Sequence, residues 1–189
     1  MPQSVLPIVT VLFFASELTL ALLKRTRRGD GATRADRGSG PVLWVVITAA
    51  ITTAIGVAGY GPARFQFPAA WSRAAALLLL VGGLAFRWWA VITLGRFFTV
   101  DVATHADHAL VDTGPFRYVR HPSYTGILLA FLGLGVSLGS WLSVTVLMVP
   151  IVAALWYRMH VEEKALRDAL GAAYDTYCTR TKRLIPGVL

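Results

Sequence analysis

Long apolar runs alternate with short polar segments along the first half of the chain. The first run extends from about Ser4 to Leu23 and stops at a basic cluster that begins with Lys24. The second extends from about Val42 to Tyr60 and the third from about Arg73 to Leu94. Each run is close to the length of about 20 residues that a helix needs to cross the hydrocarbon core of a membrane. The pattern therefore predicts three membrane spans.

A polar stretch and a longer apolar stretch follow. Gly95–Pro122 is too polar to span a membrane, whereas residues 123–160 are almost uniformly apolar and too long for one crossing. Gly139 and Ser140 lie near the middle of the apolar stretch and favour a turn. We therefore expect a hairpin of two helices, about Ser123–Leu138 and Trp141–His160.

The end of the chain, Val161–Leu189, is charged but has apolar residues at helical spacing, interrupted by Gly171. This predicts two short amphipathic helices. The expected fold class is an all-α integral membrane protein with five transmembrane helices, the last two forming a hairpin, and short cytosolic C-terminal helices. We expect an N-terminal three-helix membrane region, residues 1–94, and a second region, residues 95–189.

Composition and charge agree with this interpretation. Hydrophobic residues make up 56% of the chain and charged residues only 15%, against about 25% in soluble domains, which excludes an ordinary soluble domain and a disordered chain. The single cysteine, Cys178, excludes a disulfide framework and a cysteine-based metal site. We expect no metal and no nucleic-acid partner. The oligomeric state stays open.

The positive charges predict the orientation. Of the 18 Lys and Arg residues, 15 fall in the segments that five crossings place on one side of the membrane. Because such residues stay cytoplasmic, we expect the N-terminus outside and the C-terminus in the cytosol. The abundance of Ala, Gly, Val and Arg suggests a GC-rich genome and favours a bacterial inner (plasma) membrane.

Polar residues gather on the predicted cytosolic side. His105, His108 and His121 lie in the polar stretch, and His160 precedes Glu162 and Glu163. Such a cluster is typical of a functional face, although a solvated loop that merely joins two spans would have the same composition.

The order of these residues carries a resemblance. Residues 108–126 read HALVDTGPFRYVRHPSYTG, and residues 162–186 read EEKALRDALGAAYDTYCTRTKRLIP. Together with Leu94-Gly95-Arg96-Phe97-Phe98-Thr99, they resemble the isoprenylcysteine carboxyl methyltransferase family and its relatives, the membrane phospholipid methyltransferases. The resemblance covers about residues 94–187 and makes residues 95–189 a methyltransferase-like catalytic region.

The resemblance implies S-adenosylmethionine as methyl donor. Glu162 or Glu163 would hold its ribose diol or its ammonium group, and His121, with the amides at a helix start, would hold its carboxylate. Arg120 would orient an acceptor carboxylate, and Arg120 and Glu163 are the expected catalytic residues. The expected cofactor-binding residues are His108, Leu110, Val111, Gly114, Tyr118, His121, Pro122, Tyr124, Glu162 and Glu163.

Structural roles compete with these assignments. Tyr118 and Tyr124 are also typical interfacial anchors, the Glu pair suits a helix start, and Arg120 could contact lipid phosphate.

The acceptor is expected to be lipophilic: an isoprenoid, a phenolic lipid, a phospholipid or a lipidated protein. A carboxylate acceptor is already ionised at neutral pH, whereas a phenol or an amine would need a base such as His121, His160 or a Glu. The alternatives are an NADPH-dependent membrane reductase of the sterol-reductase type and a small membrane transporter.

Two further charges lie within predicted spans. Glu17 and Arg87 each lie roughly 10 Å inside the cytosolic edge, at 1.5 Å per helical residue. Because charges at such depth are costly unless they are paired, we expect them to pair within the bundle or to face a lipid cavity together.

Overall fold

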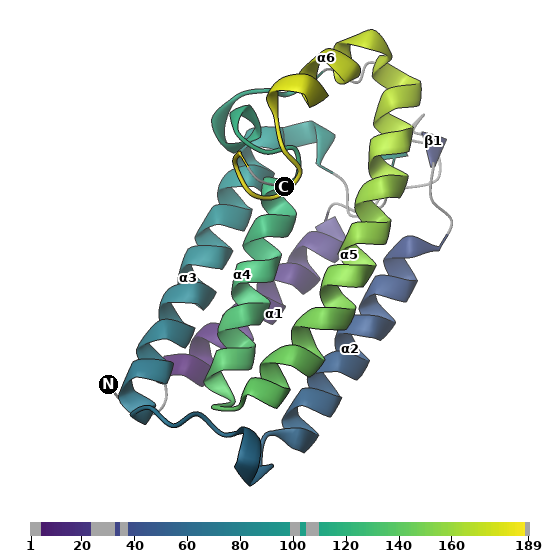
Figure 1. Cartoon of the computed structure of the whole chain (residues 1–189). Coiled ribbons are helices and arrows are strands. Elements are labelled where there is room, and N and C mark those ends of the chain that lie inside the picture. Colours follow the sequence, from purple (N-terminus) through teal and green to yellow (C-terminus); the bar gives the residue numbers. More distant parts are fainter. Residues whose placement is uncertain (1–4, 24–32, 35–37, 99–102, 105–109, 188–189) are drawn as a thin grey trace.

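The structure is a computed structural model of the whole chain, and it describes residues 5–23, 33–34, 38–98, 103–104 and 110–187. These residues are almost entirely helical (Figure 1). The α-helices are α1 (Val5–Leu23), α2 (Ser39–Val57), α3 (Ala69–Leu94), α4 (Pro122–Ser137), α5 (Trp141–Leu170) and α6 (Ala172–Arg180). Short 3₁₀ turns cover Gly61–Ala63, Gly95–Phe97 and Gly114–Arg117, and two-residue strands β1 (Thr33–Arg34) and β2 (Ala103–Thr104) pair antiparallel.

Three of the described helices, α2, α3 and α5, are long and apolar enough to cross a membrane. Two shorter apolar helical stretches accompany them, Thr10–Leu20 within α1 and the 16-residue α4. The prediction of an all-helical integral membrane protein is confirmed at this level.

The expectation for the C-terminal part needs a correction. We expected the last span to end at His160 and a separate amphipathic helix to follow, but α5 continues without a break to Leu170. No helix-breaking residue stands between His160 and Leu170, so the apolar part and the amphipathic part form one helix. The helix ends at Gly171, whose φ of +53° favours glycine, and α6 begins after it.

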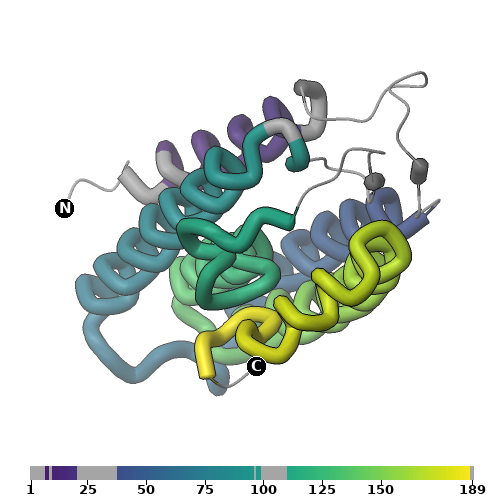
Figure 2. Tube along the Cα trace, turned by 90° about the horizontal axis from the view of Figure 1, so that it is seen from above, coloured from purple at the N-terminus to yellow at the C-terminus, as the bar shows by residue number. Residues whose placement is uncertain are grey.

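The helices pack in an order that differs from their order in the chain. α3 lies against α4, α2 lies against α5, and α4 and α5 contact each other, with only residues 138–140 between them. Seen along the bundle, α1 lies beside α3, on the other side of the molecule from the long α2–α5 pair (Figure 2).

Three glycines bring α3 and α4 into backbone contact. A Cβ atom on Gly83 would lie 2.6 Å from the carbonyl oxygen of Gly126, and one on Gly126 would lie 2.7 Å from the amide nitrogen of Arg87. Gly133 meets the carbonyl oxygen of Ala76 in the same way, at 2.8 Å. Such small residues let membrane helices approach closely. The contact fixes Arg87 of α3 opposite the first turn of α4.

Candidate functional site

The polar residues gather where α4 begins and α5 ends, at the end of the bundle that carries α6; we call this the α6 end (Figure 1). The C-terminal segment 181–184 runs alongside the start of α4. The amide of Arg120 donates to the carbonyl of Lys182 at 2.7 Å, and that of His121 donates to the carbonyl of Arg183 at 2.9 Å. The chain therefore folds back so that its last residues close the site.

Glu163 is the centre of a buried ionic cluster. Its carboxylate accepts hydrogen bonds from Arg183 Nη2 at 2.8 Å and from Arg120 Nε at 3.1 Å, and His121 Nε2 lies 3.2 Å from it. The Glu163 residue is 4% exposed. Because three basic side chains surround this single carboxylate, Glu163 holds together α5, the start of α4 and the C-terminal segment.

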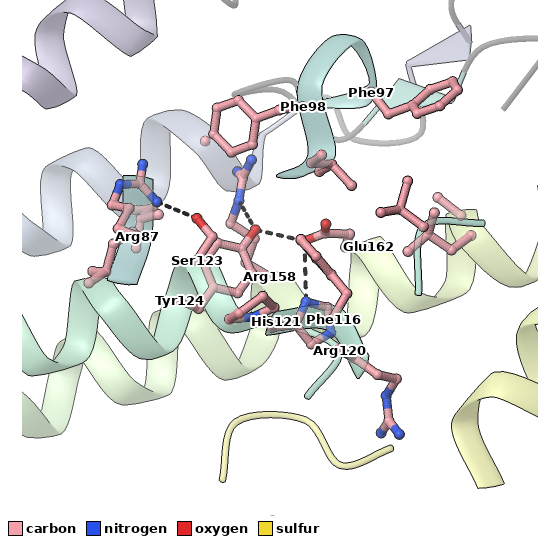
Figure 3. Close-up of a pocket in the computed structure, with 18 of the residues that line it drawn as sticks. Arg87, Phe97, Phe98, Phe116, Arg120, His121, Ser123, Tyr124, Arg158 and Glu162 are labelled. Carbon is pink, nitrogen blue, oxygen red and sulfur yellow. Dashed lines mark hydrogen bonds and ion pairs between the residues drawn. The ribbon is translucent and has the colours of Figure 1, made fainter. Parts of the chain in front are cut away.

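The expected acceptor-binding arginine, Arg120, is part of this cluster. Besides Glu163, its guanidinium donates to the carbonyl oxygen of Thr181 at 2.5 Å and to that of Cys178 at 3.3 Å. In Figure 3 the guanidinium points away from the other labelled side chains. These contacts fasten the C-terminal segment to the bundle.

A second chain of polar contacts crosses the site through Tyr124. The Tyr124 hydroxyl donates to Glu162 Oε2 at 2.7 Å and accepts from Arg158 Nε at 3.0 Å (Figure 3). Arg158 Nη1 also donates to Ser39 Oγ of α2 at 3.1 Å. The Glu162 carboxylate reaches His121 Nδ1 at 3.8 Å and is 31% exposed, in contrast to its buried neighbour.

The two deeper charges pair, as expected. Both Nε and Nη2 of Arg87 donate to the carboxylate of Glu17, the latter at 2.6 Å, and Nη1 donates to Ser123 Oγ at 2.6 Å. Arg87 and Glu17 are 5% and 8% exposed. The ion pair joins α1 to α3, and through Ser123 to the first turn of α4.

A single cavity connects these groups. At the α6 end its wall includes Arg120, His121, Tyr124, Arg158 and Glu162, and the Glu17–Arg87 pair lies further along it. Its remaining wall is formed mostly by apolar side chains of the bundle interior, among them Phe13, Phe14, Leu43, Trp44, Ile47, Ile127 and Phe131. The cavity therefore joins a charged end to an apolar interior.

Most of the expected site residues that the structure describes line this cavity: Leu110, Val111, Arg120, His121, Pro122, Tyr124 and Glu162. Three are not part of its wall. Glu163 lies behind it in the ionic cluster, and Tyr118 is 58% exposed. Gly114 has a φ of +55°, and a Cβ atom there would lie 3.0 Å from Thr93 Oγ1, so it serves the turn. His108 lies outside the described residues.

Sequence reasoning missed Arg158 and Arg183. Arg158 stands four residues before Glu162, which places both on one face of a helix, so a signal was present. Arg183 joins the ionic cluster only because the C-terminal segment returns to α4, and no local pattern indicates this. Among the described residues, no group of three or more His, Cys, Asp and Glu is placed to hold a metal ion.

The comparisons with known proteins agree with this geometry. The model of the isoprenylcysteine carboxyl methyltransferase (ICMT) family matches residues 76–168, which contain most of α3, all of α4 and α5 as far as Asp168. Residues 76–168 thus match the model of this family, and we call them the ICMT region. The resemblance deduced from the sequence is thereby confirmed, and the ICMT region includes His121, Tyr124, Arg158 and the Glu pair.

Relatives of this ICMT region include enzymes from plants and yeast. The chain is 31% identical over 112 residues to the probable protein-S-isoprenylcysteine O-methyltransferase of Oryza sativa subsp. indica, covering 58% of this chain and 59% of that protein. It is 33% identical over 113 residues to the protein-S-isoprenylcysteine O-methyltransferase of Schizosaccharomyces pombe, covering 59% and 48%. The chain thus spans about three fifths or less of these two relatives.

A solved structure extends the similarity beyond the ICMT region. The structure of the eukaryotic intramembrane Ras methyltransferase ICMT superposes with a TM-score of 0.66 at 25% sequence identity. The match covers 95% of this chain and 64% of that chain. The arrangement of α1 and α2 is therefore also similar to that of a membrane methyltransferase.

Proposed function

We propose that this protein is an integral membrane methyltransferase that uses S-adenosylmethionine to methylate a lipophilic acceptor at the cytosolic face of the membrane. The observation that carries the proposal is the cavity with a charged end and an apolar interior, built largely by the ICMT region. A charged, water-soluble donor suits the first part, and a lipid chain suits the second. The printed names of the relatives, which are O-methyltransferases, support the reaction type.

The chemistry of the cavity wall fits the donor. S-adenosylmethionine supplies an electrophilic methyl group on a sulfonium. Glu162 offers a partly exposed carboxylate to an ammonium or a ribose diol, and it is placed for this by the Tyr124 hydroxyl. Glu163 keeps its structural position instead, because its oxygens already contact Arg120, His121 and Arg183. The sequence left open which of the two Glu residues faces the donor, and the geometry supports Glu162.

The acceptor class follows from the charges that face the cavity. The relatives' names point to the carboxylate of a prenylated cysteine, and a carboxylate is ionised at neutral pH and needs no base. Two arginines, Arg120 and Arg158, contribute to the polar part of the wall, and the guanidinium of Arg120 is held by Glu163 and the carbonyl oxygen of Thr181. Arg120 is the residue that the resemblance implies for orienting the acceptor carboxylate. Arg158 also lines the wall and its Nε donates to the Tyr124 hydroxyl, so it shares this task in our proposal.

The chain's own residues exclude water and align the reactants. The C-terminal segment closes the α6 end through Arg183 and Thr125, whose hydroxyl donates to the carbonyl of Leu184 at 2.9 Å. Methyl transfer is an in-line displacement, so a fixed geometry and a dry site supply most of what the protein can contribute.

The proposed topology has five crossings, α1 to α5, with α4 and α5 as the hairpin and the N-terminus outside. This places the basic segments and the α6 end in the cytosol, and the composition favours a bacterial inner membrane. In this scheme residues 1–94 form the N-terminal membrane region and residues 95–189 the catalytic region, although both contribute to the cavity wall.

The experiment measures ligand binding by calorimetry on detergent-purified protein, with S-adenosylhomocysteine and NADPH as probes. We expect S-adenosylhomocysteine to bind and NADPH not to bind. Glu162→Gln should weaken the binding by about 10-fold or more, because a hydrogen bond to a charged group contributes about 1.5–3 kcal/mol. The control is Asp175→Asn, which breaks an exposed ion pair with Arg167 outside the cavity and should leave the affinity unchanged.

The same protein in lipid vesicles tests the acceptor. Methyl transfer is measured with a prenylated cysteine that has a free carboxylate, with a phenolic polyprenyl lipid and with phosphatidylethanolamine. Transfer to the carboxylate alone is expected. Binding of NADPH instead of S-adenosylhomocysteine would favour the reductase, and binding of neither to folded protein in lipid would leave a transporter or scaffold.

A further inference from the structure

The hydroxyl of Tyr174 is a buried polar group without a hydrogen-bond partner. Tyr174 lies in the first turn of α6, is 1% exposed and lines the cavity. Its hydroxyl is the one buried side-chain polar atom, among the described residues, for which no partner is present. Buried hydroxyls are almost always hydrogen-bonded, and leaving one unpaired costs about 1–3 kcal/mol. Packing explains why the Tyr174 ring is buried, but it does not explain why its hydroxyl is left unpaired.

A neighbouring tyrosine shows the contrast. Tyr177 lies one turn further along α6, and the two ring centroids are 6.1 Å apart. Its hydroxyl donates to the carbonyl oxygen of Phe116 at 2.6 Å, which ties α6 to the 3₁₀ turn before α4. Both residues line the cavity and both are buried. The hydroxyl of Tyr177 thus has a structural task within the fold, and that of Tyr174 has none.

The wall around Tyr174 differs from the charged part of the cavity. The residues that α6, the end of α5 and residues 110–116 contribute to the wall are apolar or aromatic. We call them the α6 slot: Leu110, Val111, Phe116, Leu166, Leu170 and Tyr177. The charged and polar groups of the wall come instead from Arg120 and His121, just before α4, from Arg158 and Glu162 of α5, and from the Glu17–Arg87 pair further along the cavity. A molecule with a charged amino-acid part and a flat heterocycle would place the former at the charges and the latter in the slot.

We propose that the Tyr174 hydroxyl hydrogen-bonds to the adenine ring of the methyl donor and makes the α6 slot selective for this base. The inference rests on the proposed function, because it names the part of the donor that this end of the cavity receives. Burial raises the pKa of Tyr174, and the nearby Glu163 carboxylate raises it further, so the hydroxyl stays protonated at neutral pH. A neutral hydroxyl donates to a ring nitrogen or accepts from an amino group.

The oxygen atom is closed to water in the present geometry. The adenine therefore reaches it only when the Tyr174 ring or a neighbouring side chain shifts slightly as the donor enters. The burial of this unpaired hydroxyl predicts how two substitutions change the stability of the protein without ligand. Removing the hydroxyl leaves the stability unchanged or raises it, because the removed group has no partner, whereas removing the Tyr177 hydroxyl lowers the stability.

The test compares Tyr174→Phe with Tyr177→Phe on full-length detergent-purified protein. Calorimetry with S-adenosylhomocysteine gives the affinity, and thermal unfolding without ligand gives the stability. Tyr174→Phe is expected to weaken binding by about 3- to 10-fold, the range of one neutral hydrogen bond, without lowering the melting temperature. Tyr177→Phe is expected to lower the melting temperature, since its hydroxyl acts on the fold. The control for affinity is Asp175→Asn, which breaks an exposed ion pair outside the cavity and should leave the binding unchanged.

Analogues identify the contacted part of the donor. The wild type and Tyr174→Phe are titrated with the 3-deaza and 7-deaza forms of S-adenosylhomocysteine and with the inosine form. The difference between wild type and Tyr174→Phe should vanish for the analogue that lacks the contacted group. A difference that persists for every analogue would overturn the assignment to adenine. Equal affinity of the two proteins for S-adenosylhomocysteine would overturn the role of Tyr174, whereas failure of the wild type to bind it would overturn the proposed function itself.

Discussion

Removing either partner of the Glu17–Arg87 ion pair should lower the stability of the protein, because the remaining charge is then buried without its partner. The side chains are 10% and 7% exposed and meet through two hydrogen bonds. Removing one partner of such a buried pair leaves an uncompensated charge and typically costs about 3–5 kcal/mol. We expect Glu17→Gln and Arg87→Gln each to destabilise the protein by about this amount.

The double variant should recover part of the loss, because neither charge is then left alone. A coupling energy of up to about 3 kcal/mol is typical of residues in one network. In a chain of this length, each kcal/mol corresponds to about 2–4 °C in melting temperature. The coupling should therefore appear as a melting temperature of the double variant above the additive value, by up to about 6–12 °C.

The assay is thermal unfolding of the purified variants in one detergent, followed by size-exclusion chromatography. Ser123→Ala is the matched control, because it removes only the hydroxyl that accepts from Arg87 Nη1 and should cost about 1 kcal/mol. Strictly additive effects of the two Gln substitutions would refute the reasoning. They would mean that the two charges contribute independently, in spite of their contact.

Three further outcomes are expected. Gly126→Ala should lower the melting temperature, because its methyl group would lie 2.7 Å from the backbone of α3 and overpacking costs about 1–3 kcal/mol; Gly82→Ala, with no atom within 4 Å, should not. Arg183→Met removes a 2.8 Å contact with Glu163, so limited proteolysis should cleave the C-terminal segment sooner than in the wild type. Burial raises the pKa of Tyr177 from 10.0 to about 12, so the folded state holds this proton more tightly; the unfolding free energy should fall as the pH rises from 10 to 12, and less steeply in Tyr177→Phe.

Hydropathy and charge predicted the helices and the buried ion pair because both follow from local physical requirements. Apolar runs of sufficient length indicate membrane helices, and the depth of Glu17 and Arg87 in their helices required a partner for each. The predicted boundaries of α3 and α4 differ from the structure by only a few residues. The prediction was wrong where it depended on the continuity of α5, since the change from apolar to amphipathic pattern is not itself a helix end.

The detail of the site could not be predicted in the same way. Glu162 and Glu163 are adjacent, so they point in directions about 100° apart on a helix, and only the packing of α5 decides which one faces the cavity. The role of Glu163 depends on Arg183, which is 20 residues away and returns through α6. Such long-range pairings leave no trace in local spacing.

The wall of the cavity is formed by two parts of the chain, the first two helices and the ICMT region with the C-terminal segment. The residues matched by the ICMT family begin at position 76, after α1 and α2, yet these two helices supply Phe13, Phe14 and Trp44 to the apolar wall. Changes at these apolar positions can thus alter the shape of the apolar part of the cavity, while Glu17 and Ser39 of the same helices keep their contacts with Arg87 and Arg158. Under the proposed function, chimeras that exchange the apolar cavity-lining residues of α1 and α2 should therefore carry acceptor preference with them.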